Sequence, residues 1–131
     1  MGGFPCVFIM NHRQLTLKLK HPEKCDGNIL FVTHKKMFYN LARYCDMQPE
    51  VKRWMYMVTS ESYNSSVDGQ QHDAKFDFVV ETTTGNYYVK FVSVVKNDKL
   101  LNEEVEYLKK ACDTKGLVFK PINEMDYKFL K

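Results

Sequence analysis

Two residues of the chain have types and a spacing that would let them do chemistry together. Asp77 and Lys90 each interrupt an apolar run. A short turn at residues 82–85 would join the two runs into a hairpin, with Glu81 opposite Asn86 and Asp77 opposite Lys90. Metal-dependent phosphodiester cleavage uses carboxylates to hold Mg²⁺ and a lysine to steady the attacking water or the phosphate. The pair therefore predicts part of such a site.

A second carboxylate is harder to place. In the predicted register Asp77, Tyr88 and Lys90 share one face, and a slip of one residue would separate Asp77 from Lys90. Glu81 and Asp73 each lie four residues from Asp77, which at about 3.3 Å per residue is roughly 13 Å, too far for one ion on an unbent strand. Two interpretations stay open: Asp77 holds Mg²⁺ with help from water and phosphate oxygens, or Asp77 and Lys90 form a partly buried ion pair.

The first part of the chain predicts an arm and a helix. Residues 4–10 are apolar with a proline among them, which indicates an edge strand or an extended arm. Residues 14–20 alternate apolar and polar side chains, as a half-buried strand or an arm on a partner does. Residues 33–46 carry apolar side chains at helical spacing, with Thr33 as the expected N-cap. The polar residues 21–28 predict a loop between these elements.

The later elements surround the central hairpin. Residues 51–58 predict a strand, and residues 59–71 predict a loop that contains a hairpin tip. A helix is expected from Asn97 or Asp98 to about Thr114, with Gly116 as its stop. The remaining expectations are a short buried strand at residues 117–119 closed by Pro121, and a last helical turn at residues 123–130.

The order of elements predicts an α/β fold of the mixed α+β kind. It consists of a mixed β-sheet flanked by two helices, with an extended N-terminal arm. The second helix leads to a final strand, so at least one pair of neighbouring strands should be parallel. With 131 residues the chain predicts a single domain, 1–131, divided into an arm (1–30) and a core (31–131).

Composition permits nucleic-acid contact without requiring it. The formal charge is +3. His34, Lys35 and Lys36 form either a solvated basic turn or a surface that faces phosphate. If the chain binds DNA, we expect the contacts at a group of basic residues: His34, Lys35, Lys36, Lys52 and Arg53. The sequence has neither a signal-peptide pattern nor an apolar run long enough to cross a membrane, so we expect no secretion by a signal peptide and no membrane partner.

The four cysteines form no CxxC pair, and His21 and Cys25 with His12 or His34 match no standard zinc spacing.

Five stretches in order resemble one family. Residues 21–28 resemble N-P-E-K-Y-x-G, residues 44–51 resemble Y-C-D-x-N-P-x-V, residues 72–78 resemble H-R-Y-F-P-D-F, and residues 87–90 resemble L-I-E-x-K; Trp54 falls on the family's tryptophan. Together they cover residues 21–92. The pattern is similar to PD-(D/E)XK nuclease-fold proteins, and among them to the head-completion proteins of contractile-tailed phages, which are related to the TnsA transposon endonucleases.

The resemblance implies a nuclease-like core at residues 31–131 and a degenerate active site. The family's helix glutamate is replaced by Phe38, its proline before the acid by Phe76, and the glutamate of E-x-K by Tyr88, so only Asp77 and Lys90 remain. It therefore implies a structural protein of virion assembly, located in the virion or the host cytoplasm, with other virion proteins and double-stranded DNA as partners. The alternatives are an endonuclease that uses Asp77 and Lys90, with Mg²⁺ on Asp77 as its cofactor, and a non-catalytic DNA-binding protein. For the structural protein no cofactor is expected.

Overall fold

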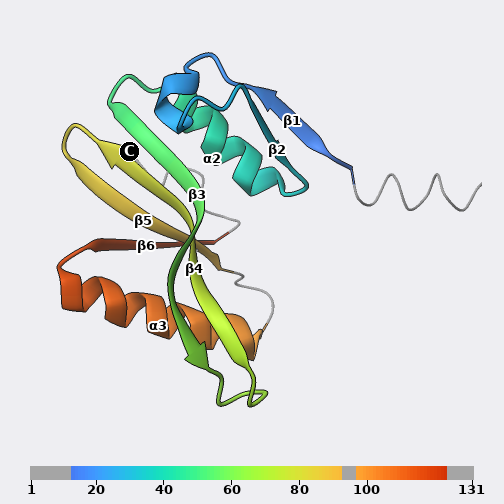
Figure 1. Ribbon diagram of the computed structural model, residues 1–131, viewed down its shortest axis with the longest axis vertical. Helices are drawn as coiled ribbons and strands as arrows, with labels where there is room; N and C mark the ends of the chain where they lie inside the picture. The colour runs from blue at the N-terminus through green and yellow to red at the C-terminus, as the bar shows by residue number, and fades with distance from the viewer. Residues whose placement is uncertain (1–12, 93–96, 124–131) are drawn as a thin grey trace, which may run out of the picture. The chain divides into compact units, whose positions relative to one another are not determined.

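The computed structural model describes residues 13–92 and 97–123 (Figure 1). The chain divides into two compact units, one ending at Pro49 and the other beginning at Glu50. The expected arm at residues 1–30 within a single domain stays a prediction. The expected strand at residues 4–10 and the expected last helical turn lie outside the described residues, apart from Asn123, which belongs to a strand.

The first unit is a two-stranded antiparallel sheet with one helix packed against it. Strand β1 (Leu15–Lys18) pairs with β2 (Leu30–Thr33), and the 3-10 turn η1 (Pro22–Cys25) lies in the connection between them. The predicted alternation is confirmed in β1, where the leucines are half-buried and the intervening side chains are exposed. A hairpin alone is marginally stable in water, so the packing of helix α2 (Lys36–Met47) against both strands stabilises it.

Helix α2 begins later than the sequence predicted. Thr33 is the last residue of β2, and its hydroxyl accepts a hydrogen bond from the Lys35 amide at 3.1 Å, while Lys35 itself is the N-cap. Thr33 therefore shapes the turn between strand and helix and does not cap the helix. The predicted apolar face is confirmed, since its central side chains are buried: Phe38, Leu41, Ala42 and Cys45.

The second unit is built on a four-stranded mixed sheet in the order β3-β4-β5-β6. Strands β3 (Val51–Asn64), β4 (Gln71–Thr82) and β5 (Gly85–Val92) are antiparallel neighbours, and β6 (Val118–Asn123) runs parallel to β5. Helix α3 (Lys99–Lys115) makes the crossover between β5 and β6. The mixed α+β class, the mixed sheet and the predicted parallel pair are thereby confirmed, while the nuclease-like core stays a prediction.

The hairpin of β3 and β4 is longer than expected. Residues 59–64 continue β3 where the sequence predicted a loop, because cross-strand pairing with β4 extends as far as Asn64 opposite Gln71. The tip occupies residues 65–70, which confirms the predicted tip region. Two irregularities interrupt the pairing, one between Val51 and Arg53 and one between Thr59 and Glu61. The tip of this twisted hairpin reaches beyond α3 (Figure 1).

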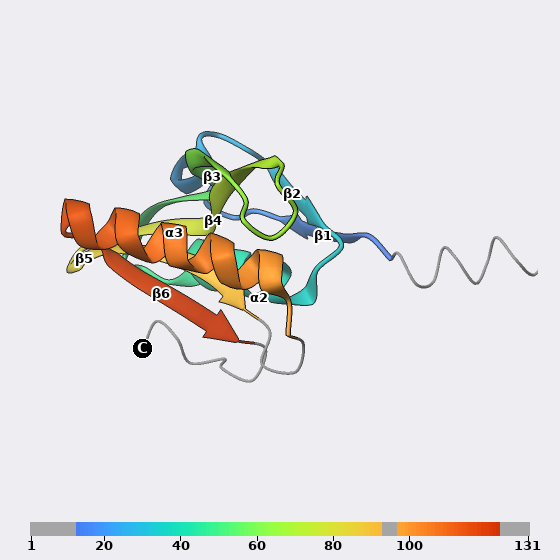
Figure 2. The same cartoon turned by 90° about the horizontal axis from the view of Figure 1, so that it is seen from below.

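Helix α3 covers one face of the sheet (Figure 2). The Asp98 side chain caps its first turn by accepting the Leu101 amide at 3.1 Å, and Gly116 ends it in the left-handed conformation at φ 69°. Both ends agree with the prediction. The core beneath the helix joins residues of β3, β4 and α3: Tyr63, Ala74, Phe76, Val79, Leu108 and Cys112.

Strand β6 was expected to end before Pro121, but it continues through it to Asn123. Pro121 pairs with Lys90 of β5. Proline is tolerated at this position because β6 lies at the edge of the described sheet, where one side of the strand has no strand neighbour. In residues 13–92 and 97–123, no helix is long and apolar enough to cross a membrane.

Candidate functional site

Asp77 and Lys90 meet as the register predicted. Glu81 lies opposite Asn86, and the β4–β5 pairing runs on to Phe78 opposite Val89. One position further along the strands, the Lys90 Nζ atom lies 3.4 Å from Asp77 Oδ1. The turn at residues 82–85 is confirmed, and with it the shared face of the two charged residues.

The second oxygen of Asp77 is also occupied. Asp77 Oδ2 accepts a hydrogen bond of 2.7 Å from the backbone N–H of Phe91. The carboxylate therefore bonds to β5 through both oxygens, once to a side chain and once to the backbone. Such an arrangement holds the two strands together where their regular pairing ends.

Glu104 completes the site from helix α3. Its Oε2 atom lies 3.1 Å from Lys90 Nζ and accepts the backbone N–H of Lys75 at 2.9 Å. Glu104 was not among the site residues predicted from the sequence. The available signal was its position three residues after Leu101 and four before Leu108, which places an acid on the inward face of an amphipathic helix.

Asp77, Lys90 and Glu104 form a buried ion cluster that joins β4, β5 and α3. Their side chains are 8%, 9% and 17% exposed. A buried charge is costly unless it is paired and hydrogen-bonded, and here each charge has a partner of opposite sign. Two carboxylates and one ammonium group leave the ion cluster with a formal charge of about −1.

Three carboxylate oxygens of the ion cluster already have hydrogen-bond or ion-pair partners that a bound Mg²⁺ would have to replace. Magnesium requires near-octahedral oxygen ligands, but Asp77 uses both its oxygens for Lys90 and Phe91, and Glu104 Oε2 is bonded to Lys90 and Lys75. A cation would have to displace the Lys90 ammonium group. The residues therefore fit a closed ion cluster better than a metal site.

The resemblance implies lost acids at two positions, and both positions hold aromatic side chains. Phe38 is buried in α2, and Tyr88 packs edge-on against Phe76 with ring centroids 5.1 Å apart. Tyr88 thus belongs to the margin of the apolar core in the second unit. Neither side chain carries a charge, so neither supplies a carboxylate.

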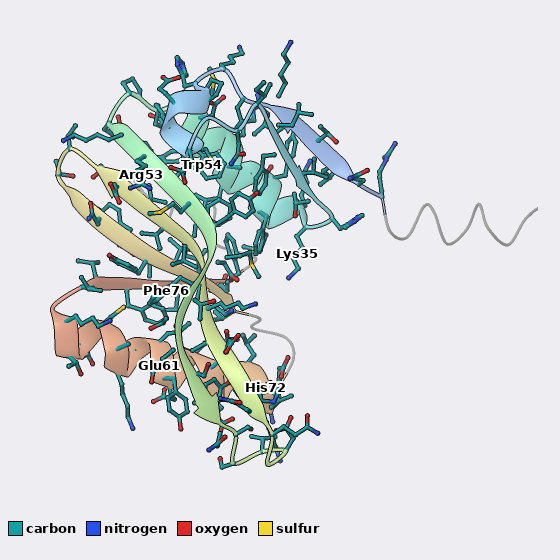
Figure 3. All side chains as sticks on the ribbon, viewed as in Figure 1. Lys35, Arg53, Trp54, Glu61, His72 and Phe76 are labelled. Atoms are coloured by element: carbon teal, nitrogen blue, oxygen red, sulfur yellow. The ribbon has the colours of Figure 1, made fainter. Side chains whose placement is uncertain are left out.

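Next to the ion cluster, Glu103 ties the β3–β4 hairpin to α3. Its carboxylate accepts the Ser65 hydroxyl at 2.6 Å and both the backbone N–H and the hydroxyl of Ser66, at 2.8 and 2.7 Å. These hydrogen bonds lower the pKa of Glu103, and the bond from the Ser65 side chain has the largest effect. His72, labelled in Figure 3, pairs with Asp68 at 2.7 Å within the hairpin, which supports a structural role for this histidine.

The predicted DNA-contacting residues are all exposed but come from both units. His34, Lys35 and Lys36 lie between β2 and the first turn of α2, while Lys52 and Arg53 lie at the start of β3. Two of the lysines contact aromatic rings, Lys35 over Phe38 at 5.0 Å and Lys36 over Tyr39 at 5.5 Å.

Two of the stretches that carry the family resemblance contact each other in the first unit. The Lys24 ammonium group donates to the carbonyls of Cys45, Asp46 and Gln48, at 3.3, 3.3 and 2.8 Å, at the C-terminus of α2. In return the buried Asp46 carboxylate accepts the amides of Lys20 and His21, each at 2.9 Å. These hydrogen bonds tie the segment after β1 to the C-terminus of α2 and stabilise the first unit.

The cysteines and histidines considered for zinc do not form a ligand cluster in the described part of the chain. Among residues 13–92 and 97–123, no three His, Cys, Asp or Glu side chains gather closely enough to hold a metal ion. Cys25, Cys45 and Cys112 are buried free thiols, and burial raises the pKa of each.

No protein-family model matches the sequence, and no curated protein is significantly similar to it.

Proposed function

We propose that the chain is a non-catalytic protein of phage virion assembly, of the head-completion or head–tail junction type. Its fold would descend from a PD-(D/E)XK nuclease, and the former active site would persist as the buried ion cluster. Two features support this proposal: the ordered resemblance across residues 21–92, and the strand–turn–strand–helix–strand order with a parallel final pair.

The single observation that carries the non-catalytic part is the closure of the ion cluster. A nuclease lysine has to reach the attacking water or the phosphate, but Lys90 Nζ lies between Asp77 and Glu104, and its side chain is 9% exposed. Both carboxylates are held in turn by backbone N–H groups of Phe91 and Lys75. The same three side chains thus stabilise the packing of α3 on the sheet.

A metal-dependent endonuclease is the second candidate, and one observation favours it. Sequence patterns identified no second carboxylate near Asp77, but the folded chain places Glu104 beside the same lysine, Lys90. Two acids and one lysine are the side chains that such a reaction uses. For cleavage to occur, Lys90 would have to leave its carboxylate partners and the three side chains would have to become accessible to DNA.

Supercoiled plasmid separates the two candidates. The full chain is incubated with plasmid and Mg²⁺ or Mn²⁺, beside Asp77→Asn and Lys90→Met, with Lys110→Met as a control that changes the charge outside the ion cluster. We expect no nicking by any of the four proteins. Cleavage by the wild type and Lys110→Met that is lost in both cluster variants would refute the non-catalytic assignment.

The virion assignment is tested on particles. Mass spectrometry of purified virions from the phage that encodes the chain should detect it at a fixed copy number per particle. Particles formed without it should be defective in joining heads to tails. Normal, infectious particles that lack the chain would refute this assignment, whatever the plasmid experiment gives.

A further inference from the structure

A groove lies between β3 and the second half of α3, on the side of the sheet that the helix covers. It has two adjoining parts of about 420 and 390 Å³, which share Ser60, Ala111 and Lys115. We call it the β3–α3 groove; Glu61 and Phe76, labelled in Figure 3, mark its sheet side. The other lining residues are Val58, Thr59, Tyr88, Tyr107, Lys110, Thr114 and Leu117.

A β-bulge places Ser60 at the centre of this groove. Thr59 pairs with Lys75 and Glu61 with Ala74, so Ser60 is the extra residue on β3 and has no cross-strand partner in the β3–β4 register. Bulges re-aim side chains and interrupt the regular row of backbone groups along a strand. A ligand would therefore be recognised by the side chains of the groove, because the bulge opposes the addition of a further strand to β3.

The floor of the groove is apolar. Phe76 is buried and packs edge-on against Tyr88, and Tyr88 and Leu117 are partly buried against the same core. Such a floor favours one aromatic or aliphatic side chain of a ligand. Single-stranded nucleic acid is bound along a track of cations and open aromatic faces, whereas Glu61 would lie beside the phosphates of a strand bound in this groove.

The rim carries charges that the described chain does not pair. Lys110 and Lys115 extend from α3 and Glu61 from β3, and none of the three forms an ion pair or a side-chain hydrogen bond with another residue of 13–92 and 97–123. By contrast, the neighbouring Glu103 bonds to the hairpin tip and Glu104 to Lys75 and Lys90. Two lysines against one glutamate make the rim complementary to an acidic ligand.

We propose that the β3–α3 groove binds an acidic segment of a partner protein. The segment places one aromatic or aliphatic side chain against the partly buried Tyr88 and Leu117, and its carboxylates lie beside Lys110 and Lys115. This binding is independent of the proposed function, because none of the three residues of the ion cluster lines the groove. A folded partner could present such a segment as an exposed tail or loop.

Selection from a displayed library of random peptides tests the proposal with the full chain as target. Counter-selection uses Ala111→Trp, which fills the part of the groove common to both halves. We expect enriched peptides to combine several acidic residues with one large apolar residue. Fluorescence anisotropy of a labelled enriched peptide then gives its Kd, with labelled oligothymidylate as the nucleic-acid probe.

A charge-matched pair of variants decides whether the groove is the site. Lys110→Glu with Lys115→Glu should weaken the peptide about tenfold or more, whereas Lys99→Glu with Lys109→Glu, on the same helix but outside the groove, should leave Kd within about twofold. Ala111→Trp should also weaken binding, and circular dichroism confirms that each variant is folded. Enrichment without acidic residues, equal losses in both double variants, or tighter binding of oligothymidylate at the groove would overturn the proposal.

Discussion

Replacing Lys90 by methionine removes the one cation of the ion cluster and keeps a side chain of similar length. Asp77 Oδ1 and Glu104 Oε2 then lose an ammonium group that lies 3.4 and 3.1 Å away. Both carboxylates remain less than a fifth exposed, so water replaces the lost partner poorly. Breaking a buried ion pair from one side typically costs about 3–5 kcal/mol. That is a large part of the roughly 5–15 kcal/mol by which folded domains are stable.

Urea unfolding followed by tryptophan fluorescence measures this loss. Trp54 is the single tryptophan of the chain, and it is buried in the same unit as the ion cluster. Adding Glu104→Gln to Lys90→Met should recover part of the loss, because one unpaired charge disappears. The control Lys110→Met should change the free energy of unfolding by no more than about 0.5 kcal/mol. A loss below about 1 kcal/mol for Lys90→Met, or strictly additive effects in the double variant, would refute the closed cluster.

Three further outcomes follow from the contacts described above. Hydrogen bonds from Ser65 and Ser66 lower the pKa of Glu103 in the folded state, so the stability that Glu103 contributes is present at neutral pH and lost as the pH falls through that lowered value. The difference in melting temperature between the wild type and Glu103→Gln should therefore disappear below about pH 4. A difference that grows below that pH would contradict this prediction. Lys24→Met should destabilise the last turn of α2 by about 1.5 kcal/mol, seen as faster amide hydrogen exchange there, while Lys18→Met serves as an exposed control. Single alanine variants at Lys35, Lys36, Lys52 and Arg53 test whether the predicted basic residues contact DNA. Each lost phosphate contact should make the slope of log K for DNA binding against log salt concentration shallower by roughly one unit. Binding that does not depend on salt would exclude such contacts.

Local sequence patterns, such as turns, helix caps and apolar alternation, correctly predicted the parts of the fold in which local conformational preference and tertiary packing agree. The turn at residues 82–85 and the alternation on both sides of it fixed the register that brings Asp77 to Lys90. In the same way, Asp98 and Gly116 marked both ends of α3 before any packing was known. The parallel β5–β6 pair followed from the helix between them.

Local sequence patterns were misleading where a residue's partner lies far along the chain. Thr33 has the side chain of a helix cap, but pairing with Leu15 keeps it in β2. Residues 59–64 have loop-like composition, yet they lie opposite β4 and extend β3. The spacing of Glu104 from Leu101 and Leu108 places it on the inward face of α3, but its partners Lys75 and Lys90 are far away in the sequence. Contacts of this kind do not follow from local propensity.

Pro121 and the bulge at Ser60 have a consequence for the solubility of the chain during its synthesis. An unprotected edge strand can pair with another polypeptide and lead to aggregation, and proline and bulges are two devices that prevent this. Among the described strands of the second unit, the outer ones are β6, which contains Pro121, and β3, which contains the bulge. A nascent chain that ends before Val118 lacks β6 and leaves β5 as the outer strand, without either device. Ribosome-stalled or truncated products of this length should therefore aggregate more readily than the complete chain, and chaperones that bind extended strands should retain them.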